Sequence, residues 1–418
     1  MVMEKKKSEH KLSKVEVAST AKGGAISTFK KWLFENYELK VNMLDANDIY
    51  IVGTKDNPIE YEYDITESDI YLHALEDGLS ISRSIINNII QSPNQCVHYN
   101  PIKEYFDNLK GKYKGASQID YIINSLHMSA SADKEKNSYI IKKWLVAMAA
   151  CVYGKRPNDV ALGIISDRAG IGKTTFFDEI VPVDLRKYTM TLVKSNNNHI
   201  QSGLFSNKLL INMDELAAIT PGTENEFKML VSAEKVITNI AGTQRSKLTD
   251  RLASVCFTSN KTHEMGGFIR TNDPGLLRRL AVIEVDSIDD YREKLDRDML
   301  WAEVITLLEG GYDYTWNQED YQYLHNSNLK YIVATNAMKL IRMYYEVPMK
   351  NDKIRYMSSL DVLLEMKRDR KIPSSMTGVD EISIGKALSQ AGFKRCIKRI
   401  KDIGPRYVYE MKAINGQA

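Results

Sequence analysis

The 418-residue sequence lacks the features of a membrane, secreted or zinc-ribbon protein. No stretch approaches the roughly 18 consecutive apolar residues of a membrane-spanning helix. The basic N-terminus has no apolar run of the kind that a secretory signal needs. The four cysteines lie far apart and form no CxxC pair, which argues against a zinc ribbon and fits a reducing compartment. We therefore expect a cytoplasmic protein with no membrane partner.

A large excess of charge of one sign is also missing. The formal net charge is only +3, and 43% hydrophobic with 27% charged residues is typical of a globular protein. Overall composition therefore identifies no partner. The distribution of charge is more informative, because residues 394–412 contain seven basic and two acidic side chains.

Short apolar runs alternate with helical stretches in the middle of the sequence. The runs cover 160–166, 209–215, 253–260 and 280–285. This alternation predicts an α/β domain whose largely parallel sheet is buried on both faces. The expected divisions are a flexible basic leader (1–30), a small mixed domain (31–98), a helical, oligomerisation-type region (99–155), the α/β core (156–315), a helical connector (316–372) and a basic module (373–418).

The first apolar run leads into the sequence DRAGIGKTT and then a helix, which is the context of a phosphate-binding loop. Its glycines would let the backbone turn tightly towards phosphate, assisted by the positive end of the helix dipole. Lys173 would reach the β- and γ-phosphates, and the Thr174 hydroxyl would complete a Mg²⁺ shell. We therefore predict ATP and Mg²⁺ as cofactors, with contacts from Gly170, Ile171, Gly172, Lys173, Thr174 and Thr175.

One residue departs from the GxxxxGK[ST] pattern, because Asp167 stands where the first glycine is usual. Aspartate tolerates unusual backbone angles better than most residues, so we still expect the loop to form. Its carboxylate would be unfavourable beside phosphates unless it points away. A chance glycine-rich turn is the competing interpretation, and the strand–loop–helix context argues against it.

Polar residues end two further runs. A hydrolase of this class needs one carboxylate to hold Mg²⁺ and another to orient the attacking water, which predicts Asp214 and Glu215 respectively. In isolation, the same pattern would also fit a strand that runs into a solvated loop. Asn260 could touch the γ-phosphate or the lytic water, and a turn-forming asparagine is the alternative.

Two adjacent arginines, Arg278 and Arg279, precede the last run. A planar guanidinium is suited to stabilising charge on a transferring phosphoryl group, and in ring-forming ATPases it comes from the next subunit. A solvated basic surface is the alternative.

The order of these motifs resembles that of the superfamily-3 helicases, and more closely that of the virulence-associated protein E family of phages and mobile genetic islands. The resemblance covers about residues 99–290 and includes Tyr99-Asn100-Pro101, Lys143-Trp144-Leu145 and the segment 170–176. It implies a P-loop AAA+-like core and an ATP-dependent DNA helicase. This helicase would act as a hexameric ring in replication of a phage or mobile element, in a bacterial cytoplasm.

The resemblance also assigns roles to particular residues. It implies nucleotide and metal binding by Lys173 and Thr174, and hydrolysis by Asp214 and Glu215. It implies a sensor role for Asn260. Because the superfamily pattern places the trans-acting arginine directly before the apolar strand, it favours Arg279 over Arg278.

Alternating β-formers flank Ala-Gly-Thr-Gln within residues 234–248, which predicts a hairpin with its tip near Gly242. In superfamily-3 helicases such a hairpin projects into the ring channel and grips single-stranded DNA. Lys235, Arg245 and Lys247 are therefore expected to contact phosphates. A solvated hairpin without a ligand is the alternative.

Near the C-terminus a helix is expected from Ser383, followed by a turn at Gly392. The run 394–400 would then form a basic second helix, and 406–409 a strand. This is the plan of a winged-helix module, which places a basic recognition helix in the major groove. The expected contacts with duplex origin DNA are Lys394, Arg395, Lys398 and Arg399. A protein-docking module is the alternative.

Two other functions would also use a phosphate loop. A non-translocating ATPase switch in signalling or defence would bind nucleotide without responding to DNA. A small-molecule kinase would need a lid and an acceptor pocket, and neither is evident in the sequence. The basic hairpin and the arginine pair favour the helicase.

Overall fold

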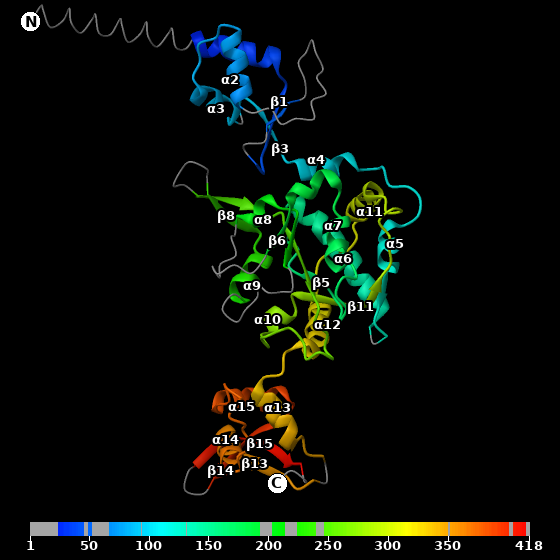
Figure 1. The fold of residues 1–418 in the computed structure, drawn as a ribbon, viewed down its shortest axis with the longest axis vertical. Helices are drawn as coiled ribbons and strands as arrows, with labels where there is room; N and C mark the ends of the chain where they lie inside the picture. Colours follow the sequence, from blue (N-terminus) through cyan, green and yellow to red (C-terminus); the bar gives the residue numbers. More distant parts are fainter. Residues whose placement is uncertain are drawn as a thin grey trace, which may run out of the picture.

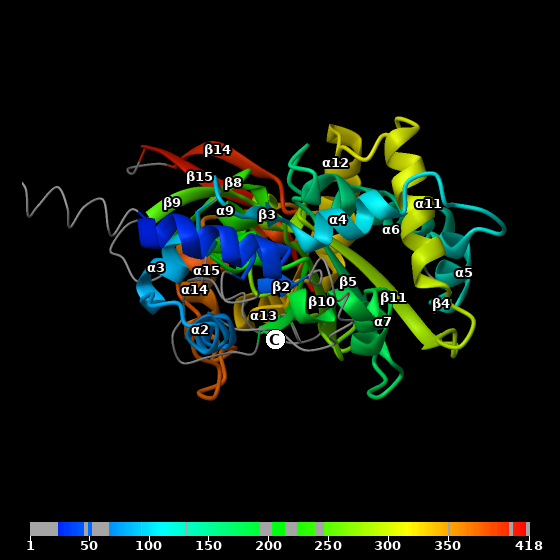
Figure 2. The ribbon, with the colours of Figure 1, turned by 90° about the horizontal axis from the view of Figure 1, so that it is seen from above.

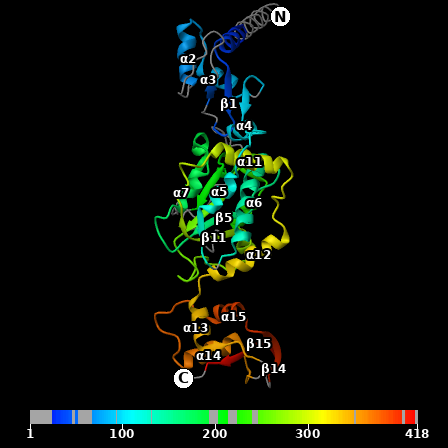
Figure 3. The ribbon, with the colours of Figure 1, turned by 90° about the vertical axis from the view of Figure 1, so that its right-hand side faces the viewer.

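The structure is a computed structural model that describes residues 24–45, 49–51, 67–92, 94–130, 132–192, 203–213, 224–239, 246–349, 352–400 and 404–414. Figures 1 and 3 show three units that follow one another along the long axis: an N-terminal unit, an α/β core and a C-terminal unit. Within the described ranges, no helix is long and apolar enough to cross a membrane.

The N-terminal unit packs helices against a small sheet of order β2-β1-β3. It contains a helix over 24–36, β1 (Leu39–Asn42), β2 (Ile49–Ile51), α2 (Glu67–Glu76), α3 (Arg83–Ile90) and β3 (Val97–Tyr99). Phe29 is buried in the same core as Leu33 and Ile86. The expected leader (1–30) is therefore helical from residue 24, because Phe29 has a core in which to bury its ring. Residues 1–23 lie outside the described part.

Helices α4 (Pro101–Asn108), α5 (Gln118–Asn124), α6 (Lys134–Val152) and α11 (Arg297–Glu309) cover one face of the central sheet. The Asp133 side chain caps α6 by accepting a hydrogen bond from the Lys136 backbone. The alanine-rich second half of α6 is buried all round. The helical region expected at 99–155 thus shares one hydrophobic core with the sheet, although it also contains the short strand β4 (Leu126–Met128).

The central sheet has the order β4-β11-β5-β10-β7-β6. Its strands are β5 (Ala161–Ile165), β6 (Thr189–Leu192), β7 (Leu210–Met213), β10 (Ser254–Ser259) and β11 (Leu280–Ile288), besides β4. All neighbours are parallel except β4, which pairs antiparallel with β11. Every residue of β5, β7 and β10 is buried. The predicted α/β fold with a mostly parallel central sheet is confirmed.

Helices α8 (Leu204–Asn207), α9 (Glu224–Ser232) and α10 (Pro274–Leu277) pack on the opposite face of the sheet. The predicted hairpin is present as β8 (Lys235–Asn239) and β9 (Ser246–Asp250), paired antiparallel. Figures 1 and 2 show it on the side of the core away from α5 and α11. Its predicted tip near Gly242 lies outside the described residues.

A short parallel bridge anchors the end of the core, after α12 (Gln318–Asn328) and the 3₁₀ helix η3 (Leu329–Tyr331). The Tyr331 carbonyl accepts hydrogen bonds from the backbone N–H groups of Phe268 (2.9 Å) and Ile269 (3.0 Å). The Val333 N–H donates to the Ile269 carbonyl at 2.8 Å. Gly267 has a φ of +78°, and a Cβ there would lie 2.2 Å from the Tyr331 oxygen, so this close approach requires glycine.

The C-terminal unit has its own hydrophobic core, whose residues begin at Ala337. It contains α13 (Asn336–Tyr344), β12 (Tyr345–Glu346), β13 (Arg355–Met357), α14 (Ser359–Arg368), α15 (Glu381–Gln390), β14 (Arg395–Ile400) and β15 (Gly404–Ala413). Strand β15 pairs antiparallel with β12, β13 and β14. The segment expected as a connector (316–372) is therefore shared: Trp316 and α12 pack with the core, and α13 and α14 pack with α15.

The prediction of a basic helix at 394–400 is wrong, because residues 395–400 form the strand β14. It pairs with β15 along its whole length, from Arg395 opposite Tyr409 to Ile400 opposite Gly404. Ile397 and Ile400 are three residues apart, which fits a helix face, but β-branched residues also favour strands. The long antiparallel partner decides between the two conformations. The helix expected from Ser383 is present as α15 and ends before Gly392, whose φ is +83°.

Candidate functional site

The predicted phosphate loop connects the central strand β5 to α7 (Lys173–Glu179). Gly170 and Gly172 have φ values of +75° and +91°. A Cβ at either position would meet nothing within 4 Å, so backbone conformation rather than crowding favours glycine here. Open space on both glycines leaves room for a ligand to approach the loop backbone. Ile171, Thr174 and Thr175 belong to the same loop and the first turn of α7.

Lys173 is held inside this loop. Its side chain is only 7% exposed, and its Nζ donates a hydrogen bond to the Arg168 carbonyl at 2.6 Å. Burial lowers the pKa of Lys173, and the negative charge of Asp167 opposes that shift. A buried ammonium group that is hydrogen-bonded to a backbone carbonyl is suited to binding an anion such as a phosphate group.

Asp167 differs from the usual glycine in charge and not in backbone conformation. Arg370 is the one non-glycine residue of the described ranges with φ in the left-handed region, so Asp167 has an ordinary φ. The position therefore does not need glycine's conformational freedom. The Asp167 side chain is exposed, and its charge acts on Lys173.

The strands β5, β7 and β10 are parallel and end at one edge of the sheet. Strand β10 lies between β5 and β7 and is parallel to both. The Ser166 N–H, just past β5, donates to the Ser259 carbonyl at 3.1 Å, and Asn260 follows directly. Strand β7 ends at Met213, and the predicted Asp214 and Glu215 lie outside the described residues. For Mg²⁺, the described part therefore supplies Thr174 alone of the two predicted ligands.

The predicted arginines lie at the junction of α10 and β11. Arg278 is exposed, and its guanidinium stands 5.4 Å from the centre of the Tyr321 ring. Arg279 is half-buried, with its Nε donating to Ser232 Oγ at 2.8 Å and its Nη1 to the Gly275 carbonyl at 2.6 Å. The two neighbours therefore occupy different environments.

Other residues of this region carry no motif and were not anticipated. Asn328 is fully buried, and its Nδ2 donates to the carbonyls of Leu277 and Leu280, both at 2.7 Å. Glu284 accepts a hydrogen bond from the Tyr331 hydroxyl at 2.8 Å. These contacts join residues about 50 positions apart, and only the tertiary structure brings them together.

The lysines predicted on the hairpin lie on opposite faces of it. Thr238 pairs with Lys247 and Lys235 with Asp250, so the alternation of a strand separates the two lysines. Lys235 also forms an exposed ion pair with Asp250 at 3.7 Å. The third predicted contact, Arg245, lies outside the described residues.

The predicted basic residues of the C-terminal unit lie on and beside β14. The Arg395 guanidinium stacks on Tyr407 at 3.9 Å, and the Lys398 ammonium lies 4.2 Å from the Tyr356 ring centre. Lys394 pairs with Glu410 at 3.3 Å, and Arg399 is exposed.

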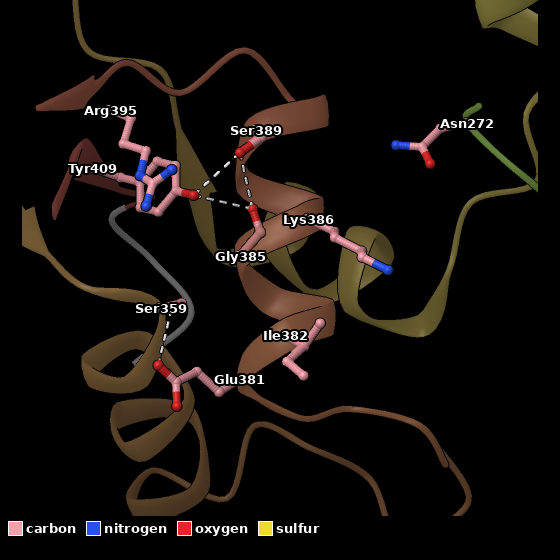
Figure 4. Close-up of a pocket in the computed structure, with 9 residues that line it drawn as sticks. All are labelled: Asn272, Ser359, Glu381, Ile382, Gly385, Lys386, Ser389, Arg395 and Tyr409. Carbon is pink, nitrogen blue, oxygen red and sulfur yellow. Dashed lines mark hydrogen bonds between the residues drawn. The ribbon is translucent and has the colours of Figure 1, made fainter. Parts of the chain in front are cut away.

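Figure 4 shows that Arg395 borders a groove along α15. The Tyr409 hydroxyl lines this groove and donates a hydrogen bond to the Gly385 carbonyl. Lys386 and Ser389 of α15 line it, together with Asn272 of the core. The groove therefore combines cationic and hydrogen-bonding groups from α15 and the β14–β15 hairpin with the carboxylate of Glu381.

Fold and site together define a mixed α/β protein built on a mostly parallel sheet, with a glycine-rich loop at the edge where its strands end. The model of the virulence-associated protein E-like domain matches residues 107–332, more than half of the chain. The chain belongs to this family, as the sequence resemblance indicated.

Two solved structures of the NrS-1 C-terminal region are also similar. The A form apo structure of residues 305–718 has a TM-score of 0.40 and 11% identity, covering 92% of this chain and 98% of that one. A second A form apo structure gives a TM-score of 0.38 with the same identity and coverage. A comparison with curated proteins found no significant match.

Proposed function

We propose that this protein is an ATP-dependent DNA helicase of the P-loop class, which acts in the replication of a phage or mobile genetic element. One observation carries the proposal. The central strand β5 enters a loop with two left-handed glycines and a buried lysine, beside the ends of the parallel strands β7 and β10. Ligands of open parallel sheets bind outside the carboxyl ends of the strands, at this edge.

In this proposal the loop binds the phosphates of ATP. Lys173 exchanges its bond to the Arg168 carbonyl for the β- and γ-phosphates, and Thr174 presents a hydroxyl to Mg²⁺. The Mg²⁺ ion, when bound with ATP, neutralises charge on the phosphate oxygens. Asp214 and Glu215 come directly after β7 in the sequence, and in this proposal they hold the metal and orient the lytic water. Asn260 follows β10 and acts as a sensor of the γ-phosphate.

The β8–β9 hairpin is proposed to contact single-stranded DNA, and the C-terminal unit duplex DNA. The order α13, β12, β13, α14, α15, β14, β15 supports this proposal, because apart from the two-residue β12 it follows the helix–strand–helix–helix–strand–strand order of winged-helix modules. In this arrangement α15 takes the place of the recognition helix, and the basic β14–β15 hairpin serves as the wing. Oligomerisation into a ring, expected to be a hexamer, would let one of the paired arginines reach the neighbouring nucleotide.

The test is the rate of ATP hydrolysis with and without single-stranded DNA, alongside the particle mass with a non-hydrolysable nucleotide. We expect DNA to stimulate hydrolysis and the nucleotide to favour a ring. Hydrolysis that does not respond to DNA, in a protein that stays monomeric, would instead support a non-translocating switch. Absence of nucleotide binding would overturn both functions.

A further inference from the structure

The β14–β15 hairpin carries two large apolar side chains that the core of the C-terminal unit does not cover. Ile397 and Tyr407 are direct partners in the antiparallel register. Ile397 is 61% exposed and Tyr407 is 57% exposed. Because directly opposed residues lie close together on one face of a hairpin, the two side chains form one exposed apolar surface, the Ile397–Tyr407 platform.

This platform lies on the face of the hairpin that packs against α15. Tyr409 is two residues from Tyr407 and therefore lies on the same face of β15. Its hydroxyl donates to the Gly385 carbonyl at 3.2 Å and lies 3.1 Å from Ser389 Oγ, so α15 covers this face at Tyr409. Tyr409 is buried whereas Tyr407 is exposed. The platform therefore continues the sheet wall of the α15 groove past the part that the helix covers.

Two arginines flank the platform on the same face of the hairpin. Arg395 and Arg399 lie two residues before and two residues after Ile397 on β14, and both are exposed. The Arg395 guanidinium carbon stands 3.9 Å from the centre of the Tyr407 ring, which is the distance of a cation stacked on an aromatic face. The aromatic ring is thus held by a cation from its own hairpin.

The charge around the platform favours an anionic partner. In the described part of the two strands the one acidic residue is Glu410, and Lys394 pairs with it at 3.3 Å. The adjoining groove carries the cation of Lys386 and the carboxylate of Glu381, which accepts a hydrogen bond from Ser359 Oγ at 3.4 Å. The arginines beside the platform therefore keep an excess of positive charge, which suits a phosphate backbone.

An apolar platform among cations fits DNA whose base faces are accessible. The phosphates of any DNA can pair with the arginines. Inside a continuous duplex each base face is covered by the next base pair, so the Tyr407 ring would have nothing on which to stack. An unpaired base next to a duplex presents its face, and aromatic side chains that stack on bases are a general means of binding single strands.

We propose that the Ile397–Tyr407 platform stacks on the first unpaired base at a junction between duplex and single-stranded DNA, while the α15 groove binds phosphates of the adjoining duplex. This inference rests on the proposed function, in which the C-terminal unit binds DNA. It adds the kind of DNA that the unit recognises, which is a junction rather than an uninterrupted duplex.

The experiment measures the affinity of the full-length protein for two probes with the same duplex sequence. One duplex is closed at both ends by non-nucleotide linkers, and the other opens at one end into a fork with 2-aminopurine at the first unpaired position. Tyr407→Ala should weaken binding to the fork on the order of tenfold, abolish the fluorescence change of 2-aminopurine and leave affinity for the closed duplex unchanged. Tyr407→Phe keeps the ring and should bind as the wild type does. Tyr356→Ala is the matched control, because Tyr356 is 42% exposed and lies beside Lys398 on the opposite face of the sheet.

Equal affinity of Tyr407→Ala and Tyr356→Ala for the fork overturns the inference, and so does an equal loss on both probes. Weaker self-association of Tyr407→Ala with unchanged DNA affinity also overturns it, because the platform would then contact another protein chain. If Tyr407→Ala does not fold, Ile397→Thr decides, since it keeps a β-branched side chain and removes apolar surface. A selective loss on the fork supports the inference there too, and its absence contradicts it. A wild type whose ATP hydrolysis does not respond to DNA would refute the proposed function itself.

Discussion

Lys173 combines charge with burial, two properties that are costly to keep together. The side chain loses hydration, which lowers its pKa, and it gains one hydrogen bond to a backbone carbonyl. A phosphate at this position would supply the missing negative charge and favour the protonated amine. Lys173 is thus suited to binding an anion. The negative charge of the Asp167 carboxylate offsets the effect of burial on the Lys173 pKa only in part.

Lys173→Ala should therefore weaken ATP binding on the order of 100-fold, because a hydrogen bond to a charged group contributes up to about 3 kcal/mol. The measurement is titration with a fluorescent ATP analogue. Lys155→Ala, at an exposed lysine before the loop, is the matched control and should bind normally. Unchanged affinity in Lys173→Ala would remove the phosphate-loop assignment.

Glu215→Gln tests the hydrolytic role that the sequence assigns to the residue after Asp214. The amide keeps the shape of the side chain and loses the basic oxygen, so ATP should bind but turn over on the order of 100-fold more slowly. Single-turnover hydrolysis and ATP affinity separate the two effects. Glu264→Gln, at an exposed glutamate after β10, should retain full turnover. Near-normal hydrolysis in Glu215→Gln would point to another base.

At the scale of elements, one glycine fixes how closely β5 and β10 fit together. A Cβ on Gly163 would lie 2.1 Å from the ring of Phe257, its partner in the sheet register. The ring covers the glycine, so any larger residue at position 163 would push the ring away from the strand that precedes the predicted phosphate loop.

Gly163→Ala should lower the free energy of unfolding by about 1–3 kcal/mol, since overpacking forces the ring from its place. Denaturant unfolding of the purified variant measures this change. Gly203→Ala is a matched control, because a Cβ there meets nothing nearer than 4.0 Å. The double variant Gly163→Ala, Phe257→Leu should recover part of the loss. Equal stability of Gly163→Ala and wild type would contradict the packing argument.

The hairpin provides another prediction at this scale. Since Lys235 and Lys247 lie on opposite faces, a strand of DNA that follows one face can contact only one of them. One of the variants Lys235→Ala and Lys247→Ala should reduce the slope of log K against log salt by about 0.7, and the other should not. Fluorescence anisotropy with a single-stranded oligonucleotide gives both slopes. Equal reductions would mean that DNA passes around the hairpin tip.

Some of this structure could be predicted from the sequence, because the physical signal was local. Buried parallel strands are continuous apolar runs, and the runs at 160–166, 253–260 and 280–285 all form strands. The prediction for residues 394–400 was wrong, because a seven-residue run with Ile397 and Ile400 fits the periodicity of a helix as well as that of a strand. The contacts of Asn328 and Ser232 could not be predicted, since partners about 50 residues away leave no local pattern.

At the scale of the whole molecule, separate hydrophobic cores imply separable functions. The core and the C-terminal unit each bury their own apolar residues. A change on the surface of one unit should therefore leave the chemistry of the other intact.

Lys386→Ala combined with Arg395→Ala should weaken binding to duplex DNA and leave ATP hydrolysis at saturating single-stranded DNA unchanged, because two cations of the α15 groove are lost. Duplex affinity and ATPase rate are measured on the same preparation. Lys367→Ala, at an exposed lysine of α14, is the control for net charge. Full duplex affinity in the double variant would exclude the groove as a DNA interface.

The parallel bridge at the end of η3 has a mechanical consequence. A pull on the C-terminal unit along the chain reaches residue 333 first, where the hydrogen bonds of Tyr331, Ile269 and Val333 lie side by side. Such bonds share a load in shear, so they resist it together. Asn328, which binds the carbonyls on either side of the arginine pair, precedes this bridge in the chain. A C-terminal unit under tension would thus strain the bridge before it could displace Arg278, and the α/β core would keep its geometry while the C-terminal unit moved.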